Sequence, residues 1–543
     1  MSVTRYELNL VLRTDSPLHS GGAEYTVDRS RPSDDAEVPE RQTETRAFAR
    51  DGAGRPVLSG RSVKGALRAT WTEAYGRDKD HKAVRALWGD QDRAAALTVH
   101  AIDLTDARTA DRTGIAVDRY WGTAGDTALF EHEIIPSGED LHLRLTGQVG
   151  SVGSVDDEAD RAAFERLLGQ LVGLLRAGRV SLGGRQNAGW GRVSLQEPAT
   201  GVHVRRDVLD GPAGLLAFLE DSDRDVVVDV VDPPGPRVVT VTIDWSSPTG
   251  ILVARPRNTH ERGNDETIPT KPLRERSRRD TDPEDPGAMV LPGSSVRGAL
   301  RTRASRIART VLGVEGRLPE EVEDWSCTGV HDQLAQDPWL VRELFGSTER
   351  RGAVSVRETT ASKERGSFLR MHNAIDRWTG GVVDGGLYSE TVVDASWNAL
   401  VLEVDLRRIA GDAGVAAGSV RAQAGAAGEA APRREVALNR RRAALCLLGL
   451  VVAELATGTL PLGSRGTRGM GAVEVRGVTV NGPADLIGAP WRLGASAPGL
   501  EGGRQIAHDL LAQLRTLNEA IASDGGGEWA DYLDETTTHR EAQ

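Results

Sequence analysis

The sequence predicts an α+β protein built from two tandem copies of one folded unit. The main observation is a segment, Gly60–Arg68, that recurs as Gly293–Arg301 with Gly, Ser, Val, a basic residue, Gly, Ala, Leu and Arg in the same order. Three further segments follow each copy in the same order: 87–89 and 344–346, 116–119 and 374–377, and 182–193 and 462–473. Because internal repeats set the architecture, we expect each copy to form its own domain.

The chain length supports this division, because 543 residues are too many for a single hydrophobic core. We expect a first domain at residues 1–202, a linker at 203–237, a second domain at 238–525 and an acidic flexible tail at 526–543. Two insertions are also expected: residues 318–338, which are absent from the first copy, and the Gly- and Ala-rich residues 409–432.

The composition indicates a soluble chain without a cysteine framework. Hydrophobic residues make up 39%, no run approaches a membrane span and the N-terminus lacks a signal-peptide core, so we expect a cytoplasmic protein with no membrane partner. Cys327 and Cys446 lack the spacing of zinc ligands, which argues against a zinc site. The net charge is -12, yet arginines crowd residues 274–279 and 297–309, and such local basic faces can bind phosphate.

Strands and helices are expected in a similar order in both copies. Residues 6–12 alternate like a half-buried strand, and a long polar loop with several acids follows at 23–55. A helix starts at Gly60 and another at Gly293, because apolar residues recur at helical spacing in both: Val63, Leu67 and Trp71, and Val296, Leu300 and Ala304. Further strands are expected at 98–104, 141–145, 354–358 and 400–404, and further helices at 160–177 and 435–456.

The starts of the two repeated helices are candidate phosphate sites. Free backbone N–H groups and the helix dipole favour an anion at such a position, and basic side chains one turn apart add positive charge. The candidate residues are Gly60, Ser62, Lys64 and Arg68 in the first copy, and Ser295, Arg297 and Arg301 in the second. The alternative is an amphipathic helix with a solvated basic side, which the recurrence of the pattern disfavours.

An Asp-Arg pair followed by an aromatic residue occurs in each copy. Arg119 precedes Tyr120 and Trp121, and Arg377 precedes Trp378. Aromatic rings stack on bases, so both segments are candidate contacts for bases or sugars. An internal Asp-Arg ion pair that fixes a loop is the alternative.

A glycine-rich loop closes each copy. Glycine permits close approach of the backbone to a ligand, and Arg185, Arg192, Arg465 and Arg468 supply charge. Neither loop has the Gly-Lys-Ser/Thr of a P-loop or a GxGxxG after a strand, so we expect no ATP or NAD cofactor. A plain tight turn is the alternative for either loop.

Together these motifs resemble the RAMP superfamily, the repeat-associated proteins of CRISPR systems. More narrowly, the chain is similar to the backbone subunits of type III effector complexes, here as a fused pair in a III-D-like format. The resemblance implies two modified ferredoxin-like, RRM-like domains that grip guide RNA (crRNA), each with an inserted thumb hairpin that enters the duplex of guide and target RNA. It places Gly60–Arg68 and Gly293–Arg301 on guide phosphates and the segments from Asp118 and Asp376 in the thumbs. Other effector subunits are then further partners.

The resemblance also implies a catalytic aspartate. Members that cut target RNA use an aspartate in the loop before the Gly-x-Ser helix, together with a divalent cation such as Mg²⁺. Asp28 is the candidate for catalysis and metal binding in the first copy, with Asp34 and Asp35 as alternatives, and Asp265 is the candidate in the second. The second copy departs from the pattern, because residues 246–250 lack the Leu-His-x-Gly-Gly of residues 18–22.

Two other functions are open. One is a scaffold that binds guide RNA and cuts nothing. The other is a metal-independent ribonuclease that processes the guide, with His19 as general acid or base toward a ribose 2'-OH.

Overall fold

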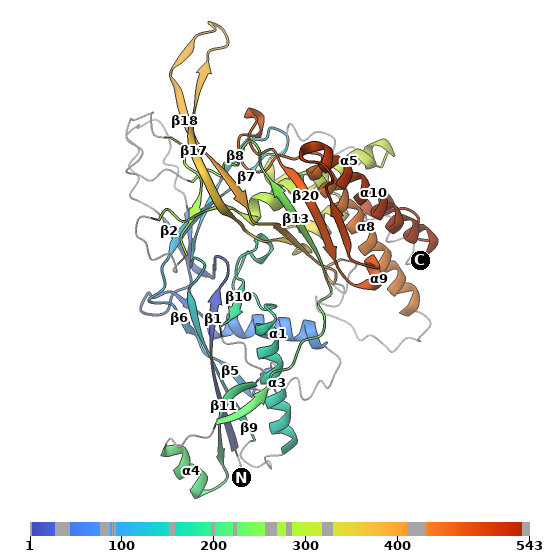
Figure 1. The fold of residues 1–543 in the computed structure, drawn as a ribbon. Coiled ribbons are helices and arrows are strands. Elements are labelled where there is room, and N and C mark those ends of the chain that lie inside the picture. The colour runs from blue at the N-terminus through green and yellow to red at the C-terminus, as the bar shows by residue number, and fades with distance from the viewer. Residues whose placement is uncertain are drawn as a thin grey trace.

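The structure is a computed structural model in which two units follow one another along the chain (Figure 1). It describes residues 3–27, 44–76, 87–89, 91, 94–150, 158–196, 201–220, 225–255, 269–277, 285–317, 329–409 and 430–534. Most of the first unit lies in the lower half of Figure 1 and the second unit in the upper half.

The first unit is built around one antiparallel sheet with two helices packed against it. The strand order is β12-β11-β1-β9-β5, and β10 also pairs with β1. The strands are β1 (Val3–Thr14), β5 (Leu97–Val99), β9 (Asp140–Val149), β10 (Val193–Leu195), β11 (Gly201–Leu209) and β12 (Asp225–Asp229), and the helices are α1 (Gly60–Tyr75) and α3 (Glu158–Arg176). The chain order β1-α1-β5-β9-α3-β11 is that of a ferredoxin-like fold.

The second unit repeats this plan. Its sheet has the order β16-β19-β13-β20-β21, and the chain order is β13-α5-β16-β19-α8-β20. The elements are β13 (Val238–Ser246), α5 (Gly293–Val314), β16 (Val354–Val356), β19 (Leu400–Asp405), α8 (Ala430–Ala456), β20 (Glu474–Asn481), β21 (Trp491–Gly494) and α10 (Gly499–Ser523). The expected α+β class with two tandem ferredoxin-like units is confirmed.

A β-hairpin is inserted between the second and third strands of each ferredoxin-like sheet. The first consists of β7 (Ala110–Val117) and β8 (Ala124–Ile134), and the second of β17 (Thr359–Ile375) and β18 (Val382–Trp397). The pairs Val117↔Ala124 and Ile375↔Val382 close the two hairpins in the same register, so residues 110–134 correspond one to one with 368–392. Figure 1 shows the second hairpin projecting from the body of the molecule.

Shorter elements connect these parts. They are β2 (Gly21–Val27), β3 (Glu44–Phe48), β4 (Val57–Leu58), β6 (Ile102–Asp103), α4 (Pro212–Leu219), β14 (Arg274–Glu275), β15 (Ala288–Leu291), α6 (Val330–Ala335), α7 (Trp339–Phe345) and α9 (Ala484–Ile487). Within the described residues, three 3-10 turns, Gln186–Ala188, Gly466–Arg468 and Trp529–Leu533, complete the set.

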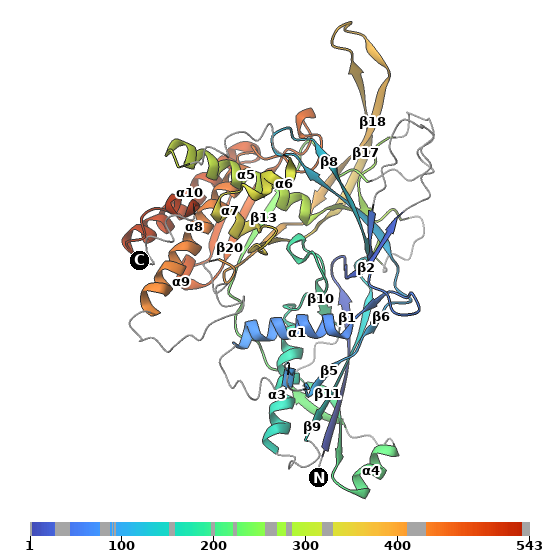
Figure 2. The ribbon, with the colours of Figure 1, turned by 180° about the vertical axis from the view of Figure 1, so that it is seen from behind.

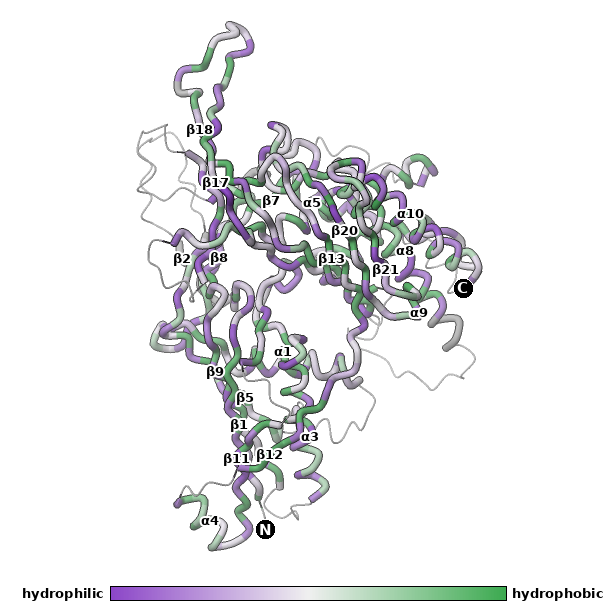
Figure 3. Tube along the Cα trace, in the orientation of Figure 1, coloured by the Kyte–Doolittle hydropathy of each residue, from purple (hydrophilic) through white to green (hydrophobic). Residues whose placement is uncertain are grey.

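Alternation of apolar and polar residues accounts for the two sheets, because successive side chains of a strand point to opposite faces. On β1, Tyr6 and Leu8 are buried while Arg5 and Asn9 are exposed. Figure 3 shows this alternation of hydrophobic and hydrophilic residues along the strands. Each unit encloses its own hydrophobic core, with Phe164 fully buried in the first and Trp245 in the second.

Two expected boundaries are wrong. Most of the expected linker at 203–237 belongs to the first sheet, because β11 and β12 pair there and bury Val204 and Val228 against the core. In the expected tail at 526–543, the turn Trp529–Leu533 packs on the second core with Tyr532 and Leu533 buried. Residues 535–543, and residues 318–328 and 410–429 of the expected insertions, lie outside the described residues.

Candidate nucleic-acid interface

The two repeated helices start against a neighbouring strand at very short distance. A Cβ atom on Gly60 would lie 2.1 Å from the carbonyl oxygen of Val99. A Cβ atom on Gly293 would lie 2.2 Å from the carbonyl oxygen of Val356. Real Cβ atoms do not approach that closely, so only glycine lets each helix start pack on its sheet.

The first basic residue that the two repeated helices have in common binds the main chain of the second sheet strand. Lys64 Nζ donates a 2.8 Å hydrogen bond to the carbonyl oxygen of Leu97. Arg297 Nε donates an equivalent 3.1 Å bond to the carbonyl oxygen of Val354, and its Nη2 binds that of Phe345. Burial lowers the pKa of Arg297 to about 10, which leaves the guanidinium charged at neutral pH. Both side chains brace the helix against its strand.

The second basic residue binds the short turn that recurs after each helix. Arg68 donates to the carbonyl oxygen of Gly89 over 3.2 Å, and Arg301 donates to that of Gly346 over 2.9 Å. The Leu-Trp-Gly and Leu-Phe-Gly segments therefore recur as partners of these arginines. The repeated motif has a structural cause, and RNA binding by these side chains stays a prediction.

These contacts leave the first helix start positively charged. Carbonyl oxygens are neutral, so the bonds of Lys64 and Arg68 do not cancel the side-chain charges. Arg61 and Ser62 are exposed beside them, and within the described ranges no carboxylate pairs with Arg61, Lys64 or Arg68. The dipole of α1 adds to this potential, although the Ser62 N–H already donates to the Ser59 side chain over 3.2 Å.

The second helix start is more closed. A Cβ atom on Gly293 would also lie 2.5 Å from the carbonyl oxygen of Ala188, which belongs to the first unit. Arg301 pairs with the buried carboxylate of Asp337 at 2.7 Å, which compensates its charge. Ser295 is half-buried, whereas its counterpart Ser62 is exposed, and the Ser295 N–H donates to the carbonyl oxygen of Pro292. The two helix starts are equivalent in structure but not in exposure to a ligand.

The first arginine of each glycine-rich loop anchors the base of a hairpin. Arg185 and Arg465 both have left-handed backbones, with φ of 55° and 66°, a conformation that costs non-glycine residues about 1 kcal/mol. Arg185 lies 3.1 Å from His132 Nε2 and over the ring of Phe130, and Arg465 Nε donates 2.5 Å to the buried carboxylate of Glu390. His132 and Glu390 are equivalent hairpin positions, so the anchor is repeated.

The other two loop arginines differ from one another. Arg192 forms a 3.1 Å ion pair with Glu403 of the second unit. Arg468 lies over the ring of Tyr388, 3.7 Å from Glu390, with 38% of its side chain exposed. Of these two arginines, only Arg468 lies on a face that the other unit does not cover.

The hairpin tips fold alike. Asp118 Oδ1 accepts the N–H groups of residues 120 and 121 at 2.8 and 2.9 Å. Asp376 Oδ1 accepts those of residues 378 and 379 at 2.9 and 2.7 Å. Each aspartate therefore caps its turn through the backbone, and the segments from Asp118 and Asp376 lie in the hairpins as expected.

The arginines that follow these aspartates have different surroundings. The Arg119 side chain is buried and pairs with Asp337, and the Arg119 backbone N–H donates to Gln333 Oε1 at 3.0 Å. Arg377 is exposed. The neighbouring aromatic rings are open to solvent, with exposed fractions of 55%, 64% and 96% for Tyr120, Trp121 and Trp378.

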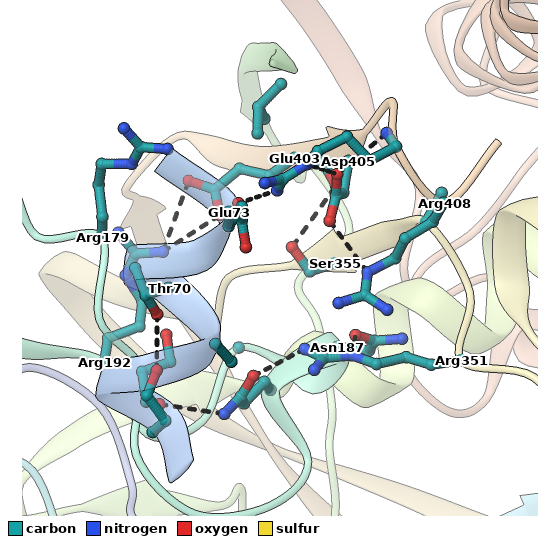
Figure 4. Close-up of a pocket in the computed structure, with 18 of the residues that line it drawn as sticks. Thr70, Glu73, Arg179, Asn187, Arg192, Arg351, Ser355, Glu403, Asp405 and Arg408 are labelled. Carbon is teal, nitrogen blue, oxygen red and sulfur yellow. Dashed lines mark hydrogen bonds and ion pairs between the residues drawn. The ribbon is translucent and has the colours of Figure 1, made fainter. Parts of the chain in front are cut away.

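A cavity of about 270 Å³ lies between the units, as Figure 4 shows. Six arginines line it, against three carboxylates: Arg179, Arg192, Arg351, Arg357, Arg407 and Arg408, and Glu73, Glu403 and Asp405. Ion pairs join several of them across or within the junction, among them Arg192 with Glu403 and Arg408 with Asp405. The lining therefore holds the two units together.

The expected catalytic and metal-binding residues Asp28 and Asp265 lie outside the described residues, as do Asp34 and Asp35. The described residues beside them lead to the hairpin bases. β2 ends at Val27 and pairs with β3, which runs parallel to β8, and Thr270 forms a parallel bridge to Glu390 on β18. Over the described ranges, no group of three or more His, Cys, Asp or Glu residues could hold a metal ion.

His19 is part of the packing around the first hairpin. It is 6% exposed, its Nδ1 lies 2.8 Å from the carbonyl oxygen of Glu133, and its ring meets that of His132 edge to face. Burial lowers the pKa of His19. This position suits a structural histidine more than a general acid or base.

A protein-family model described as RAMPs, the RAMP superfamily, matches residues 11–194 and 274–474. The two matches cover more than half of the chain, one in each unit. The chain belongs to the RAMP superfamily. Membership supports a CRISPR-associated RNA-binding role. No curated protein matches the sequence. Among the described helices of this RAMP protein, none is long and apolar enough to cross a membrane.

The carboxylates that hold the hairpins and the first glycine-rich loop of this RAMP protein were not expected from the sequence. Asp337 lies in the expected insertion 318–338, and its place before Pro338 resembles an ordinary helix start. Residues 337–346 nevertheless align without a gap with residues 80–89, so that Asp80 is the counterpart of Asp337 in the first copy. Glu390 and Glu403 are single acids in alternating strands, a pattern typical of solvated positions. In an alignment of the two copies, the partners of Arg185 and Arg465 stand at the same position, but one is His132 and the other is Glu390. The anchor therefore leaves no repeated residue type in the sequence.

Proposed function

We propose that this RAMP protein binds guide RNA as a two-unit backbone subunit of a type III CRISPR effector complex. The observation that carries the proposal is the presence of two RAMP units in one chain, with hairpins 110–134 and 368–392 at equivalent places. A nucleic-acid strand offers charged phosphates at regular intervals, so equivalent units can bind successive segments of it. Figure 2 shows the first hairpin alongside the second unit and the second hairpin projecting beyond it.

The proposed RNA contacts combine positive charge and exposed aromatic rings. Arg61, Lys64 and Arg68 give the first helix start a charge that no described carboxylate cancels. Trp121 and Trp378 expose their rings at the hairpin tips, where a base can stack on either face. Together these features support binding along the sugar-phosphate backbone with little dependence on sequence.

Arg61→Glu tests the charged part of the surface. Arg61 is exposed and makes no contact that the fold needs, so the variant should fold normally. We expect weaker RNA binding and a smaller dependence of log Kd on log salt, by about one phosphate contact. Arg504→Glu, an equal charge change on the exposed side of α10, is the matched control and should bind as the parent does. Unchanged binding by Arg61→Glu at every salt concentration would remove the first helix start from the proposal.

The proposal includes metal-dependent cleavage of target RNA by Asp28 and Asp265. The support is the position of described residues that are near these aspartates in the sequence. Val27, which precedes Asp28, ends a strand of the sheet that contains the first hairpin. Thr270, five residues after Asp265, forms a bridge to Glu390 of the second hairpin. A carboxylate and Mg²⁺ at such a place can stabilise the charge that develops on a scissile phosphate.

Cleavage is tested with the assembled complex, a matched target RNA and Mg²⁺. Asp28→Ala and Asp265→Ala should each remove one distinct cut, and the double variant should bind the target and leave it whole. Glu40→Ala, at a carboxylate of the same loop that is not a candidate for catalysis, is the matched control. Loss of both products from one single variant would mean a shared site, and normal cutting by the double variant would move the chemistry to Asp34, Asp35 or another subunit.

The same assay separates the two other candidate functions. A complex that keeps its matched target intact with Mg²⁺ present is a scaffold. Cleavage of the guide precursor in EDTA, lost on His19→Ala with folding unchanged, would instead support a guide-processing ribonuclease. The burial of His19 argues against that outcome.

A further inference from the structure

The cavity between the two units carries more positive than negative side chains. Six arginines and three carboxylates line it, which leaves the lining with a net charge of +3. Four of the arginines already share the three carboxylates in ion pairs. Arg192 and Arg357 pair with Glu403, Arg407 and Arg408 pair with Asp405, and Arg407 also pairs with Glu73.

Arg351 is the lining arginine with the least compensation. Within the described residues it forms no ion pair with a carboxylate. Its Nε and Nη2 donate to the side-chain oxygens of Asn187 and Gln186 over 2.9 and 2.7 Å, and both of these oxygens are neutral. Burial and the neighbouring Arg408 lower the pKa of Arg351 to about 10, although part of the side chain stays exposed. The guanidinium is charged at neutral pH and is repelled by Arg408, and a bound anion would relieve that repulsion.

Arg407 and Arg408 share a single carboxylate of their own strand end. Arg407 Nε lies 2.9 Å from one oxygen of Asp405, and Arg408 Nε lies 3.0 Å from the other. Burial and Arg408 also lower the pKa of Arg407 to about 10. In Figure 4, Arg351 and Arg408 lie on one side of the open space, opposite Thr70 and Glu73 of α1. The excess positive charge is therefore concentrated on the side of the second unit.

These arginines do not belong to the pattern that the two copies share. The strand registers Val356↔Leu402 and Val99↔Leu145 align the two sheets. The first-copy positions that correspond to Arg351, Arg357, Arg407 and Arg408 hold Ala94, His100, Gly150 and Ser151. A site for the regularly spaced phosphates of RNA would recur in each unit, so the charged cavity is a feature of the junction and not of the RAMP unit.

The size of the cavity favours a small ligand. Its volume of about 270 Å³ equals that of roughly nine water molecules and lies below the range of about 300–1,000 Å³ that is usual for organic ligands. Guanidinium groups bind phosphate through two parallel hydrogen bonds. Thr70, Asn187 and Ser355 add neutral polar groups to the lining. The lining therefore fits one or two phosphoryl groups together with bound water.

We propose that the cavity at the junction binds a small phosphate anion through Arg351 and Arg408. The ligand is either a free inorganic anion such as pyrophosphate or the terminal phosphates of a nucleotide. Because both units contribute to the lining, the bound anion holds them together in addition to the ion pairs. This inference goes beyond the proposed function and is independent of RNA binding and cleavage.

Calorimetric titration of the full chain, freed of RNA, with sodium pyrophosphate at constant ionic strength tests the proposal. We expect one saturable site per chain, and a melting temperature that rises by about 5–10 °C at a pyrophosphate concentration about one hundred times Kd. Arg351→Gln and Arg408→Gln should each weaken binding by about tenfold or more, because each removes a charged donor. Arg504→Gln, an equal charge change on the exposed side of α10, is the matched control and should bind as the parent does.

Glu73→Gln separates anion binding from a merely structural role of the lining. Glu73 pairs with Arg407, and its removal raises the net positive charge of the cavity. The variant should therefore bind pyrophosphate several-fold more tightly than the parent, even if it unfolds at a lower temperature. Titration with ATP distinguishes the two sources of the phosphate. Equal affinities for ATP and pyrophosphate indicate an inorganic ligand, and tighter binding of ATP indicates a nucleotide.

Three results would overturn the proposal: no saturable binding by the parent, an unchanged pyrophosphate affinity in Arg351→Gln and Arg408→Gln, or a rise in melting temperature that sodium chloride of equal ionic strength reproduces. Crosslinks from guide RNA to residues 351 or 408 in the purified complex would assign the cavity to RNA and would overturn it as well. RNA binding by the same variants is measured separately, so that failure of the anion site and failure of the proposed RNA binding give different results.

Discussion

Replacement of Asp337 by alanine should destabilise the protein more than any other single change at the junction. The Asp337 carboxylate is fully buried and receives Arg119 from the first unit, Arg301 at 2.7 Å and the Ser305 hydroxyl at 2.7 Å. Both arginine side chains are also nearly buried, at 5% and 13% exposure. Asp337→Ala would leave two guanidinium groups in the interior with no compensating charge.

The expected magnitude follows from that geometry. Removal of one partner of a buried ion pair costs about 3–5 kcal/mol, because the remaining charge stays desolvated. A unit of this size loses about 2–4 °C of melting temperature per kcal/mol, so the transition of the second unit should fall by roughly 6–20 °C. Arg119→Ala should cost less, about 1.5–3 kcal/mol, because Asp337 then keeps Arg301 and Ser305.

Differential scanning calorimetry and urea unfolding of the two single variants and the double variant provide the test. We expect the double variant to be less destabilised than the sum of the single variants, because both changes remove the same pair. If Asp337→Ala unfolds within about 0.5 kcal/mol of the parent, the range of ordinary surface substitutions, the carboxylate does not hold the junction and the reasoning is wrong.

Three further predictions concern single side chains. Burial and the neighbouring Arg185 lower the pKa of His132 to about 3. Below about pH 6.5 the unfolded chain therefore binds more protons than the folded chain, and the free energy of unfolding should fall by up to about 1.4 kcal/mol per pH unit. His132→Gln should flatten that dependence in urea unfolding between pH 7 and 5, and an unchanged slope would speak against a neutral His132. Arg297→Ala should lower stability by about 1–3 kcal/mol, because carbonyl groups lose their donor, and an RNA-binding defect without such a loss would instead assign Arg297 to phosphate. Arg465→Ala should loosen the second hairpin, seen as faster amide exchange in residues 382–392, and unchanged exchange would exclude the anchor to Glu390.

The repeat made the fold predictable from the sequence. Helical spacing of Val63, Leu67 and Trp71 identified the first helix, and the order of matched segments identified two copies of one unit. The linker was not predictable in the same way, because β11 and β12 are recognised as strands only once β1 offers an edge for pairing. Strand pairing is a tertiary property, whereas apolar periodicity is local.

The roles of the arginines depended on partners far away in the sequence. A Gly-x-Ser-x-basic pattern fits a phosphate site, yet Lys64 and Arg297 also bind carbonyl groups that belong to strands placed by the fold. Arg119 and Arg377 occupy identical turns, yet Arg119 forms a buried ion pair because Asp337 lies beside it, whereas Arg377 is exposed. No local pattern encodes that difference.

The most direct test of the proposed function is ultraviolet crosslinking of the purified complex, with the RNA-linked peptides identified by mass spectrometry. The account predicts that RNA copurifies, and that the first helix start and both hairpin tips, at Trp121 and Trp378, crosslink to one guide strand. The nucleotides joined to the two tips should be separated by a constant interval. A complex without RNA, or crosslinks that avoid both hairpins and the first helix start, would contradict the account.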